Sequence, residues 1–370
     1  MRDVLCSSSP VIDFVYTMRV RQLCDELMVD IFSRLPSKTL LRCRSLSKSW
    51  CSYLATPDFI RMHSSRFPQK LLIRHRTYHE NEEGEFEGFY TLHSEDQLPL
   101  CPTRGYIGIP QLEFPFTYST IVGSCDGIIC LFDYNDNHIT LWNPSIRRTL
   151  ILPDCPRRCY SASEIGFGYD PITDDHKVVS VPGVIGEDVE TPYVYSIKKN
   201  AWCAVSSPMP VYRRVSLKSR ACFVSGALHW LVQLYGAREF FIMKFDLSKH
   251  VFSHVPSPEP RWTKGPTAVH GCLAVVTEQS LTENWIWVRR GDSWCVVFKL
   301  KEAEEADDLR GALQLGTTGV LVFDMCFGFQ VYNPKRGAYP RLVDFNHDSF
   351  LLEICQCDET LRLLDMGTSC

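Results

Sequence analysis

The hydrophobic positions divide the chain into two regimes. In residues 19–66 they recur at every fourth position, at Leu23, Leu27, Ile31 and Leu35. This spacing predicts an amphipathic helix, which ends at Pro36 because a proline disrupts the interior of a helix. From about Gln69 onward the apolar residues fall into short runs separated by turn residues, and this pattern predicts strands.

The rest of the first regime predicts three more short helices. Ser37 is expected to cap the second helix, and the third is expected to run through Leu46, Trp50 and Leu54. Thr56 and Pro57 then offer an N-cap and a first-turn proline for a fourth. A helical unit of about 45 residues is marginal as an independent domain, so we expect it to complete its core against a partner.

The strand region has an internal rhythm. An aromatic residue followed by Asn, Asp or Ser recurs, starting at Trp142, Tyr169, Tyr195, Phe245 and Tyr332. Each pair is expected to be the end of a strand that enters a turn. The interval is 53 residues from Trp142 to Tyr195 and 50 from Tyr195 to Phe245. Periods of this length are typical of β-propeller blades, so the second regime is expected to be a propeller-like repeat.

Charge separates the same two regimes. The 370 residues carry 39 Lys and Arg against 43 Asp and Glu, a formal net charge of −4. Residues 19–66 hold nine basic and four acidic residues, so this segment is +5 and the rest is −9. The acidic remainder argues against a nucleic-acid partner, and the basic helical unit suits an acidic protein.

Cysteine usage indicates a reducing compartment. There are 17 cysteines, an odd number, with no C-x-x-C pair, so a secreted disulfide scaffold is excluded and we expect the protein in the cytoplasm, the nucleus or both. The apolar run at residues 11–16 is too short to cross a bilayer, so no membrane partner is expected. Residues 1–17 are predicted to be either a disordered tail or an upstream extension of the reading frame.

The sequence predicts neither a metal site nor a cofactor nor a catalytic centre. No nucleophile elbow, phosphate loop or zinc-protease motif is present. The close pairs that could ligate a metal lack zinc-site spacing and are expected to be core residues: Cys125 and Cys130, Cys155 and Cys159, Cys355 and Cys357, His250 and His254. Likewise, His229 and Trp230 are expected in a packed strand rather than in a ligand cage.

Specific segments resemble a known family. Residues 23–59, from Leu-Cys-Asp-Glu-Leu to Pro-Asp-Phe, resemble the F-box of plant F-box proteins. Downstream, Gly-Ser-Cys-Asp-Gly at 123–127, Leu-Trp-Asn-Pro-Ser at 141–145 and Leu-His-Trp at 228–230 resemble the F-box-associated interaction domain of the same family. The resemblance implies a helical F-box at residues 18–66 and a kelch-like, β-propeller-like domain at 67–365.

The resemblance also implies a function. It is that of a non-catalytic substrate-recognition subunit of an SCF-type (Skp–cullin–F-box) ubiquitin ligase. Its partners would be a Skp-family adaptor, the cullin and RING subunits held through that adaptor, and a target protein whose identity the sequence leaves open. Carried over by position, the adaptor-facing residues are Leu23, Cys24, Leu27, Ile31, Leu35, Pro36, Leu40, Leu41, Leu46 and Trp50.

Two points stay open at the level of sequence. The family motif usually begins Leu-Pro, whereas this chain has Leu23-Cys24, so the alternative is a decayed F-box on an interaction module that needs no adaptor. Four arginines are the candidate target contacts: Arg157, Arg158, Arg213 and Arg214. They lie in proline-rich turns, where recognition residues are commonly displayed. The alternative is that these turns are simply solvated.

Overall fold

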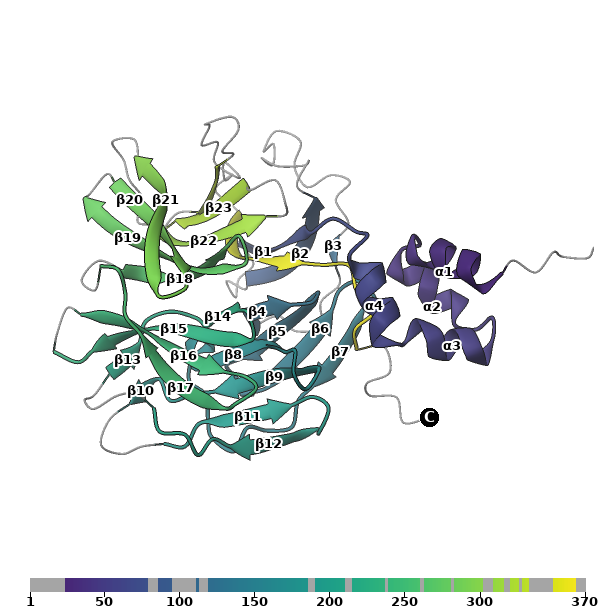
Figure 1. The fold of residues 1–370 in the computed structure, drawn as a ribbon, viewed down its shortest axis with the longest axis horizontal. Helices are drawn as coiled ribbons and strands as arrows, with labels where there is room; N and C mark the ends of the chain where they lie inside the picture. Colours follow the sequence, from purple (N-terminus) through teal and green to yellow (C-terminus); the bar gives the residue numbers. More distant parts are fainter. Residues whose placement is uncertain are drawn as a thin grey trace, which may run out of the picture.

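The structure is a computed structural model in which helices come first and strands fill the rest of the chain (Figure 1). It describes residues 24–78, 86–94, 111–112, 119–185, 190–209, 215–236, 239–259, 263–280, 283–301, 309–315, 320–325, 328–332 and 349–363. The predicted fold class, mainly β with an N-terminal helical part, is confirmed. The predicted disordered tail at residues 1–17 lies outside the described residues.

Four short helices form the helical unit: α1 (Asp25–Ser33), α2 (Ser37–Cys43), α3 (Lys48–Leu54) and α4 (Pro57–Ser64). The predicted cap of α4 is confirmed, because the Thr56 hydroxyl accepts a hydrogen bond from the Phe59 amide at 3.4 Å, with Pro57 as the first helical residue. Ser47 caps α3 in the same way, and Leu46 precedes that helix.

The predicted cap of α2 is wrong. Pro36 occupies the N-cap position and Ser37 is the first helical residue. The Ser37 amide instead donates to the carboxylate of Glu359 at 2.9 Å. A helix leaves its first amides without partners inside the helix, and here a residue 322 positions away supplies the acceptor.

Six antiparallel sheets make up the β-propeller in the part of the chain that the structure describes. The first combines β1 (Lys70–Tyr78), β2 (Phe86–Ser94), β3 (Gln111–Leu112) and β25 (Ser349–Cys357). The second contains β4 (Ser119–Cys125), β5 (Ile128–Asp133), β6 (Ile139–Asn143) and β7 (Arg148–Ile151). The third contains β8 (Ile165–Asp170), β9 (Asp175–Ser180), β11 (Tyr193–Ser196) and β12 (Ala201–Ala204). The short 3₁₀ helix η3 (Ala162–Glu164) joins the second sheet to the third.

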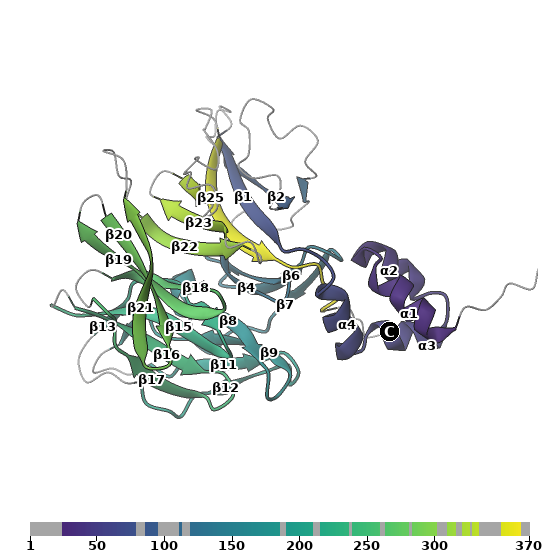
Figure 2. The ribbon, with the colours of Figure 1, turned by 45° about the horizontal axis from the view of Figure 1, so that its top comes forward.

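The remaining strands continue around the propeller (Figure 2). The fourth sheet holds β10 (Val184–Ile185), β13 (Val215–Leu217), β14 (Cys222–Val224), β15 (Ala227–Leu234), β16 (Phe240–Asp246) and β17 (Val251–Val255). The fifth holds β18 (Thr263–Val269), β19 (Cys272–Ser280), β20 (Glu283–Arg290) and β21 (Ser293–Lys301). The sixth holds β22 (Leu309–Leu315), β23 (Val320–Met325) and β24 (Gly328–Tyr332).

The two ends of the propeller meet in the first sheet. The last strand, β25, pairs antiparallel with β1, so that Leu72 lies opposite Cys355. The buried carboxylate of Glu353 on β25 pairs with Arg74 of β1 at 3.1 Å and accepts the Ile121 amide of β4 at 3.0 Å. Each sheet contacts the next, and β24 contacts β25, so the ring is closed.

Neighbouring sheets share their hydrophobic cores, as propeller blades must. Ile128–Phe132 of β5 is buried throughout. Ile129 and Leu131 pack towards the first sheet, whereas Cys130 and Phe132 pack towards the third, as the alternation of a strand requires.

The predicted turns are confirmed where the structure describes them. The carboxamide oxygen of Asn143 accepts the Ser145 amide at 2.9 Å, and Asp170 and Asp246 accept the amides two residues on, each at 3.0 Å. After β11, the Ser196 hydroxyl accepts the Lys199 amide, three residues on, at 3.1 Å. The turn that follows Tyr332 lies outside the described residues.

Candidate protein-binding surfaces

The helical unit exposes several large apolar side chains. Leu27 is 52% exposed, Ile31 42% and Leu46 62%. Leu27 and Ile31 are four residues apart on α1, so they lie on the same face of that helix. Leu46 lies in the connection between α2 and α3. We call these three residues the apolar face, and we treat it as a candidate interaction site because exposed apolar patches are typical of such sites.

The other side of the helical unit is joined to the propeller. Its core contains Phe32, Leu40, Leu54, Phe59 and Ile60 together with Ile146 of the β6–β7 turn and Leu361. Leu361 belongs to residues 358–363, which follow β25 and are called the C-terminal segment below. Figures 1 and 2 show this segment, in yellow, passing beside α4. The helical unit therefore completes its core within the same chain.

Polar contacts reinforce this junction. Besides accepting the Ser37 amide, Glu359 pairs with the ammonium of Lys70 at 3.2 Å. Burial alone would raise the pKa of Glu359, but the amide and the ammonium hold it below its usual range. The Asn143 side chain donates to the backbone carbonyls of Thr360 and Arg362 at 3.2 and 2.7 Å. The C-terminal segment is thus fixed to both the helical unit and the propeller.

The predicted adaptor contacts divide into two groups. The exposed group is Cys24, Leu27, Ile31, Pro36 and Leu46. The partly buried group, which packs against the core of the helical unit, is Leu35, Leu41 and Trp50. Leu23 lies outside the described residues.

The adaptor-facing assignment of Leu40 is corrected by the structure. Leu40 is 0% exposed and lies in the core shared with Ile146 and Leu361, so it holds the helical unit together and offers a partner no surface. Trp50 also has an internal role, because its ring packs edge-on against Phe32 with centroids 4.9 Å apart.

The basic charge of the helical unit is partly neutralised by its own acids. Arg34 and Arg66 both pair with Asp30, at 3.0 and 3.1 Å, and Arg61 pairs with Asp58. Three cations on α2 and α3 are exposed: Lys38, Arg42 and Lys48. The positive charge that faces solvent is therefore concentrated on the two helices that flank Leu46.

The four arginines predicted as target contacts differ in their exposure. Arg157 is 9% exposed and its guanidinium binds the carboxylates of Glu164 at 2.9 Å and Glu190 at 3.0 Å. It is a structural residue, so its assignment as a target contact is corrected. Arg158 is exposed, whereas Arg213 and Arg214 lie outside the described residues.

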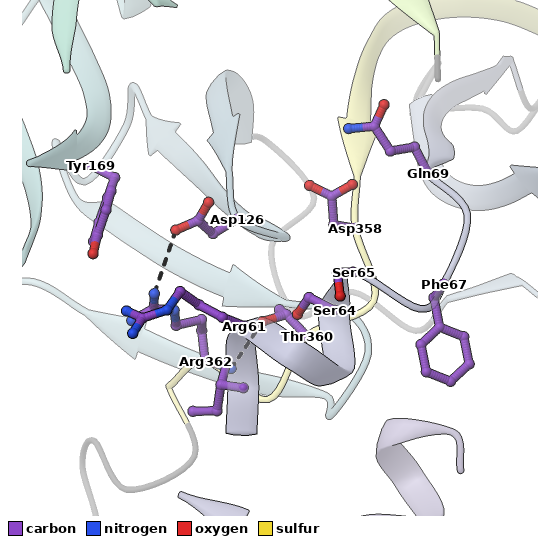
Figure 3. A pocket seen from close by; sticks show the side chains of 11 residues that line it. Arg61, Ser64, Ser65, Phe67, Gln69, Asp126, Tyr169, Asp358, Thr360 and Arg362 are labelled. Atoms are coloured by element: carbon purple, nitrogen blue, oxygen red, sulfur yellow. Dashed lines mark hydrogen bonds and ion pairs between the residues drawn. The ribbon is translucent and has the colours of Figure 1, made fainter. Parts of the chain in front are cut away.

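A pocket of about 420 Å³ lies where α4, the C-terminal segment and the propeller meet (Figure 3). Arg362 points into it between Asp126, 3.7 Å away, and the ring of Tyr169, whose centroid is 5.4 Å from the guanidinium carbon. Asp358 and Arg61 also line the pocket. The two arginines and two aspartates balance in formal charge, so the pocket does not select an anion or a cation by charge alone.

Beside this pocket, three side chains could in principle ligate a metal. Potential ligand atoms of Cys125, Asp126 and His176 lie within 4.8 Å of one another. However, Asp126 already contacts the His176 ring at 3.2 Å and the Arg362 guanidinium at 3.7 Å. Although burial opposes ionisation, these partners hold the pKa of Asp126 below its usual range. Arg362 thus supplies the positive charge that a metal would bring.

The predicted packed strand around His229 is confirmed. Trp230 is fully buried and its indole nitrogen donates to the Ser163 carbonyl at 2.9 Å. Burial lowers the pKa of His229 to about 4, which keeps its ring neutral near pH 7. These rings therefore form part of the core.

Sequence reasoning missed the contribution of the C-terminal segment to the helical unit. Leu361 and Glu359 lie more than 290 residues beyond α4 in the chain, so local patterns give no sign of their contacts. The apolar alternation Leu361–Leu363 after the last strand is the one signal that marks the segment as packed.

Comparisons with known proteins agree with this architecture. Residues 89–306 match the sequence model of the F-box associated beta propeller domain, and residues 21–62 match that of the F-box domain. The chain is 27% identical to F-box protein CPR1 of Arabidopsis thaliana over 354 residues, covering 81% of each chain. It is 24% identical over 337 residues to an F-box/kelch-repeat protein of the same plant, covering 85% of this chain and 88% of that one.

Two further matches add to the comparison. A third Arabidopsis relative is 29% identical over 239 residues, covering 64% of this chain and 61% of the relative. Among solved structures, a chain of a nidogen–laminin complex is similar with a TM-score of 0.46 at 9% identity, covering 78% of this chain and 98% of that chain. No helix among the described residues is long and apolar enough to cross a membrane.

Proposed function

Because the chain belongs to the plant F-box proteins that carry an F-box associated beta propeller domain, we propose that it is the substrate-recognition subunit of an SCF-type ubiquitin ligase. The helical unit would bind a Skp-family adaptor, and through it the cullin and RING subunits. The propeller would bind the target protein. The chain itself would carry out no covalent chemistry, and it would act in the cytoplasm, the nucleus or both.

The two-sided helical unit is the observation that carries this proposal. One side is covered by the C-terminal segment and Ile146, while the apolar face is left exposed. Completing the burial of a half-exposed side chain such as Leu27, Ile31 or Leu46 contributes about 0.8–1.5 kcal/mol, roughly half of the value for a fully exposed one. Exposed apolar residues of this kind can anchor a helical partner, and the exposed Lys38, Arg42 and Lys48 favour an acidic one.

The proposed mechanism is proximity. A target held on the propeller is tethered to the ligase through a helical unit that the C-terminal segment fixes in place. Such tethering raises the effective concentration of target lysines near the ubiquitin-conjugating enzyme. A rigid junction holds the target at one distance from the conjugating enzyme. A flexible linker would spread the target over many distances and so lower its effective concentration.

The test is the affinity of the purified full-length chain for a purified plant Skp-family adaptor. We expect the double substitution Leu27→Asp and Ile31→Asp to weaken binding at least about tenfold, since it removes about 1.5 kcal/mol or more of further apolar burial and places two carboxylates on an apolar contact. Both side chains are exposed in the free protein, so the variant should fold. Circular dichroism and thermal unfolding check this directly.

Ile172→Asp is the matched control. Ile172 is 77% exposed, but it lies in the β8–β9 turn of the propeller, so this variant should bind the adaptor like the wild type. If the wild-type chain fails to bind, or if the double variant binds as tightly as the control, the proposal is wrong. Trp50 is unsuitable for such a test because its ring supports Phe32 inside the helical unit.

A further inference from the structure

The pocket between α4, the C-terminal segment and the propeller has no part in the proposed function. Its volume of about 420 Å³ lies in the range of small-molecule sites in proteins. Its walls come from three parts of the chain (Figure 3). Charged, hydroxyl and apolar side chains line it together: Ile60, Arg61, Ser64, Tyr169, Asp358 and Arg362. A few polar groups set in apolar surface are typical of a site that binds a small molecule.

Arg362 brings a largely buried positive charge to this pocket. Its side chain is only 14% exposed. The guanidinium lies 3.7 Å from the carboxylate of Asp126 and 3.9 Å from that of Asp174, with the Tyr169 ring beside it. Both distances exceed those of hydrogen bonds, so the two carboxylates offset the charge without accepting its N–H donors. A guanidinium presents these donors as a fork that matches a carboxylate, so the carboxylate of a ligand suits this position.

The Asp358 carboxyl group has no cation of its own. None of the ion pairs among the described residues includes it, although two cations lie on neighbouring elements. Lys70, at the start of β1, pairs with Glu359 instead. Arg61 of α4 pairs with Asp58. The pocket therefore contains a carboxyl group whose charge the protein itself leaves without a counter-ion.

The surroundings of Asp358 favour a cation. Burial raises the pKa of Asp358 and the negative charge of Asp126 adds to this effect, whereas a hydrogen bond from Gln69 lowers it. An added positive charge stabilises a carboxylate in such a setting. An ammonium group is compact and donates three hydrogen bonds, so the ammonium group of a ligand suits this position.

The two positions together define the chemistry of the ligand. Asp358 and Arg362 line one pocket, but in the part of the chain that the structure describes they form no ion pair with each other. We therefore expect the two charges of the ligand to be several bonds apart. Ile60 and Phe67 add apolar wall. A dipeptide has an ammonium group at one end, a carboxylate at the other and side chains between them, and its zero net charge matches the balanced formal charge of the pocket.

We propose that this pocket binds a small zwitterion of dipeptide size with apolar side chains. Its carboxylate accepts hydrogen bonds from the guanidinium of Arg362, and its ammonium group pairs with the carboxylate of Asp358. Its apolar side chains pack against Ile60 and Phe67.

The location gives this ligand a consequence for the whole chain. Because α4, the C-terminal segment and the propeller all contribute to the walls, a bound dipeptide connects the helical unit to the propeller. A ligand that binds only the folded junction also stabilises it. The proposal does not rest on the ubiquitin-ligase role, and its test uses the chain without an adaptor.

The test is isothermal titration of the full-length protein at pH 7 with leucyl-alanine and with phenylalanyl-alanine. Each dipeptide is compared with its N-acetylated form, which lacks the ammonium group, and with its C-terminal amide, which lacks the carboxylate. We expect the tighter dipeptide to bind with a Kd below about 1 mM, and each of its blocked forms to bind at least about tenfold more weakly, because each loses one charge-assisted contact. If neither dipeptide binds in this range, or if the blocked forms bind as tightly, the proposal is overturned.

A matched pair of variants tests the ammonium position. Asp358→Asn keeps the shape of the side chain and removes its charge, so we expect it to weaken dipeptide binding at least about tenfold. Asp136→Asn removes an exposed carboxylate in the β5–β6 turn, outside the pocket, and should bind like the wild type. Equal affinities of the two variants would count against the proposal. The comparison of free and blocked dipeptides uses the wild-type protein alone, so it decides the matter even if a variant fails to fold.

Hydrogen–deuterium exchange with and without a saturating amount of the tighter dipeptide locates the site. We expect slower exchange in residues 60–69 and 358–362, which contribute most of the walls. Protection confined to other parts of the chain would mean that the dipeptide binds elsewhere, and the assignment of this pocket would be wrong.

Discussion

At the scale of single residues, the sequence identifies apolar positions in the helical unit but not the side each one faces. Leu27 and Leu40 fit the same family pattern, yet Leu27 is half-exposed and Leu40 is fully buried. Helical spacing identifies the apolar stripe of a helix, but it does not show whether another part of the same chain or a second protein covers that stripe. Here one partner is the distant Leu361 of the same chain, so the division could be seen only in three dimensions.

Cys24 is the residue on which the alternative of a decayed F-box depends. It is the N-cap of α1, with φ −65° and ψ 154°. Proline fixes φ near this value, so the backbone already has the conformation that the usual family residue would impose. The carbonyl of Cys24 still accepts the Met28 amide at 3.1 Å. The geometry at this position therefore favours a working adaptor surface.

We accordingly expect Cys24→Pro to leave adaptor affinity within about fivefold of wild type. Proline at a compatible position acts mainly by restricting the unfolded chain, which amounts to about 0.4–1 kcal/mol. Isothermal titration with the purified adaptor measures the change. A gain of a hundredfold or more would instead show that cysteine at this position disables the surface.

At the scale of elements, the C-terminal segment connects the helical unit to the propeller. Glu359 caps α2, Leu361 enters the core of the helical unit, and Leu363 enters the core between the second and third sheets. Sequence patterns located the four helices and the turn rhythm well because both are local. They could not locate a cap supplied from 322 residues away.

Leu361→Ala and Leu363→Ala form a matched pair of tests for this connection. A buried Leu→Ala change costs about 2–5 kcal/mol, and the two leucines lie in different cores. We expect Leu361→Ala to speed tryptic cleavage within the helical unit, for example after Lys38 and Arg42, while the propeller stays resistant. Leu363→Ala should leave cleavage in the helical unit at the wild-type rate.

The opposite pattern, or equal effects of both variants on the helical unit, would contradict this account. If both variants speed cleavage of the helical unit equally, the C-terminal segment acts as one body with the propeller. If neither variant speeds it, the helical unit owes its stability to its own helices alone.

At the scale of the whole molecule, the repeat period predicted the propeller, because each sheet needs neighbours to bury its faces. The closure was not predictable, since β25 joins β1 across the full length of the propeller. The outcome is a closed ring with a helical unit fastened to one side and an apolar face directed outward. That arrangement suits a protein that must hold two partners at a fixed separation.

Hydrogen–deuterium exchange of the full-length chain with and without a purified Skp-family adaptor tests this central claim most directly. We expect the adaptor to slow exchange in the first part of α1, residues 24–31, and in the α2–α3 connection around Leu46. Exchange in α4 and in the C-terminal segment should stay unchanged, because that side is already covered. Protection confined to the propeller or to α4, or no protection at all, would contradict the account.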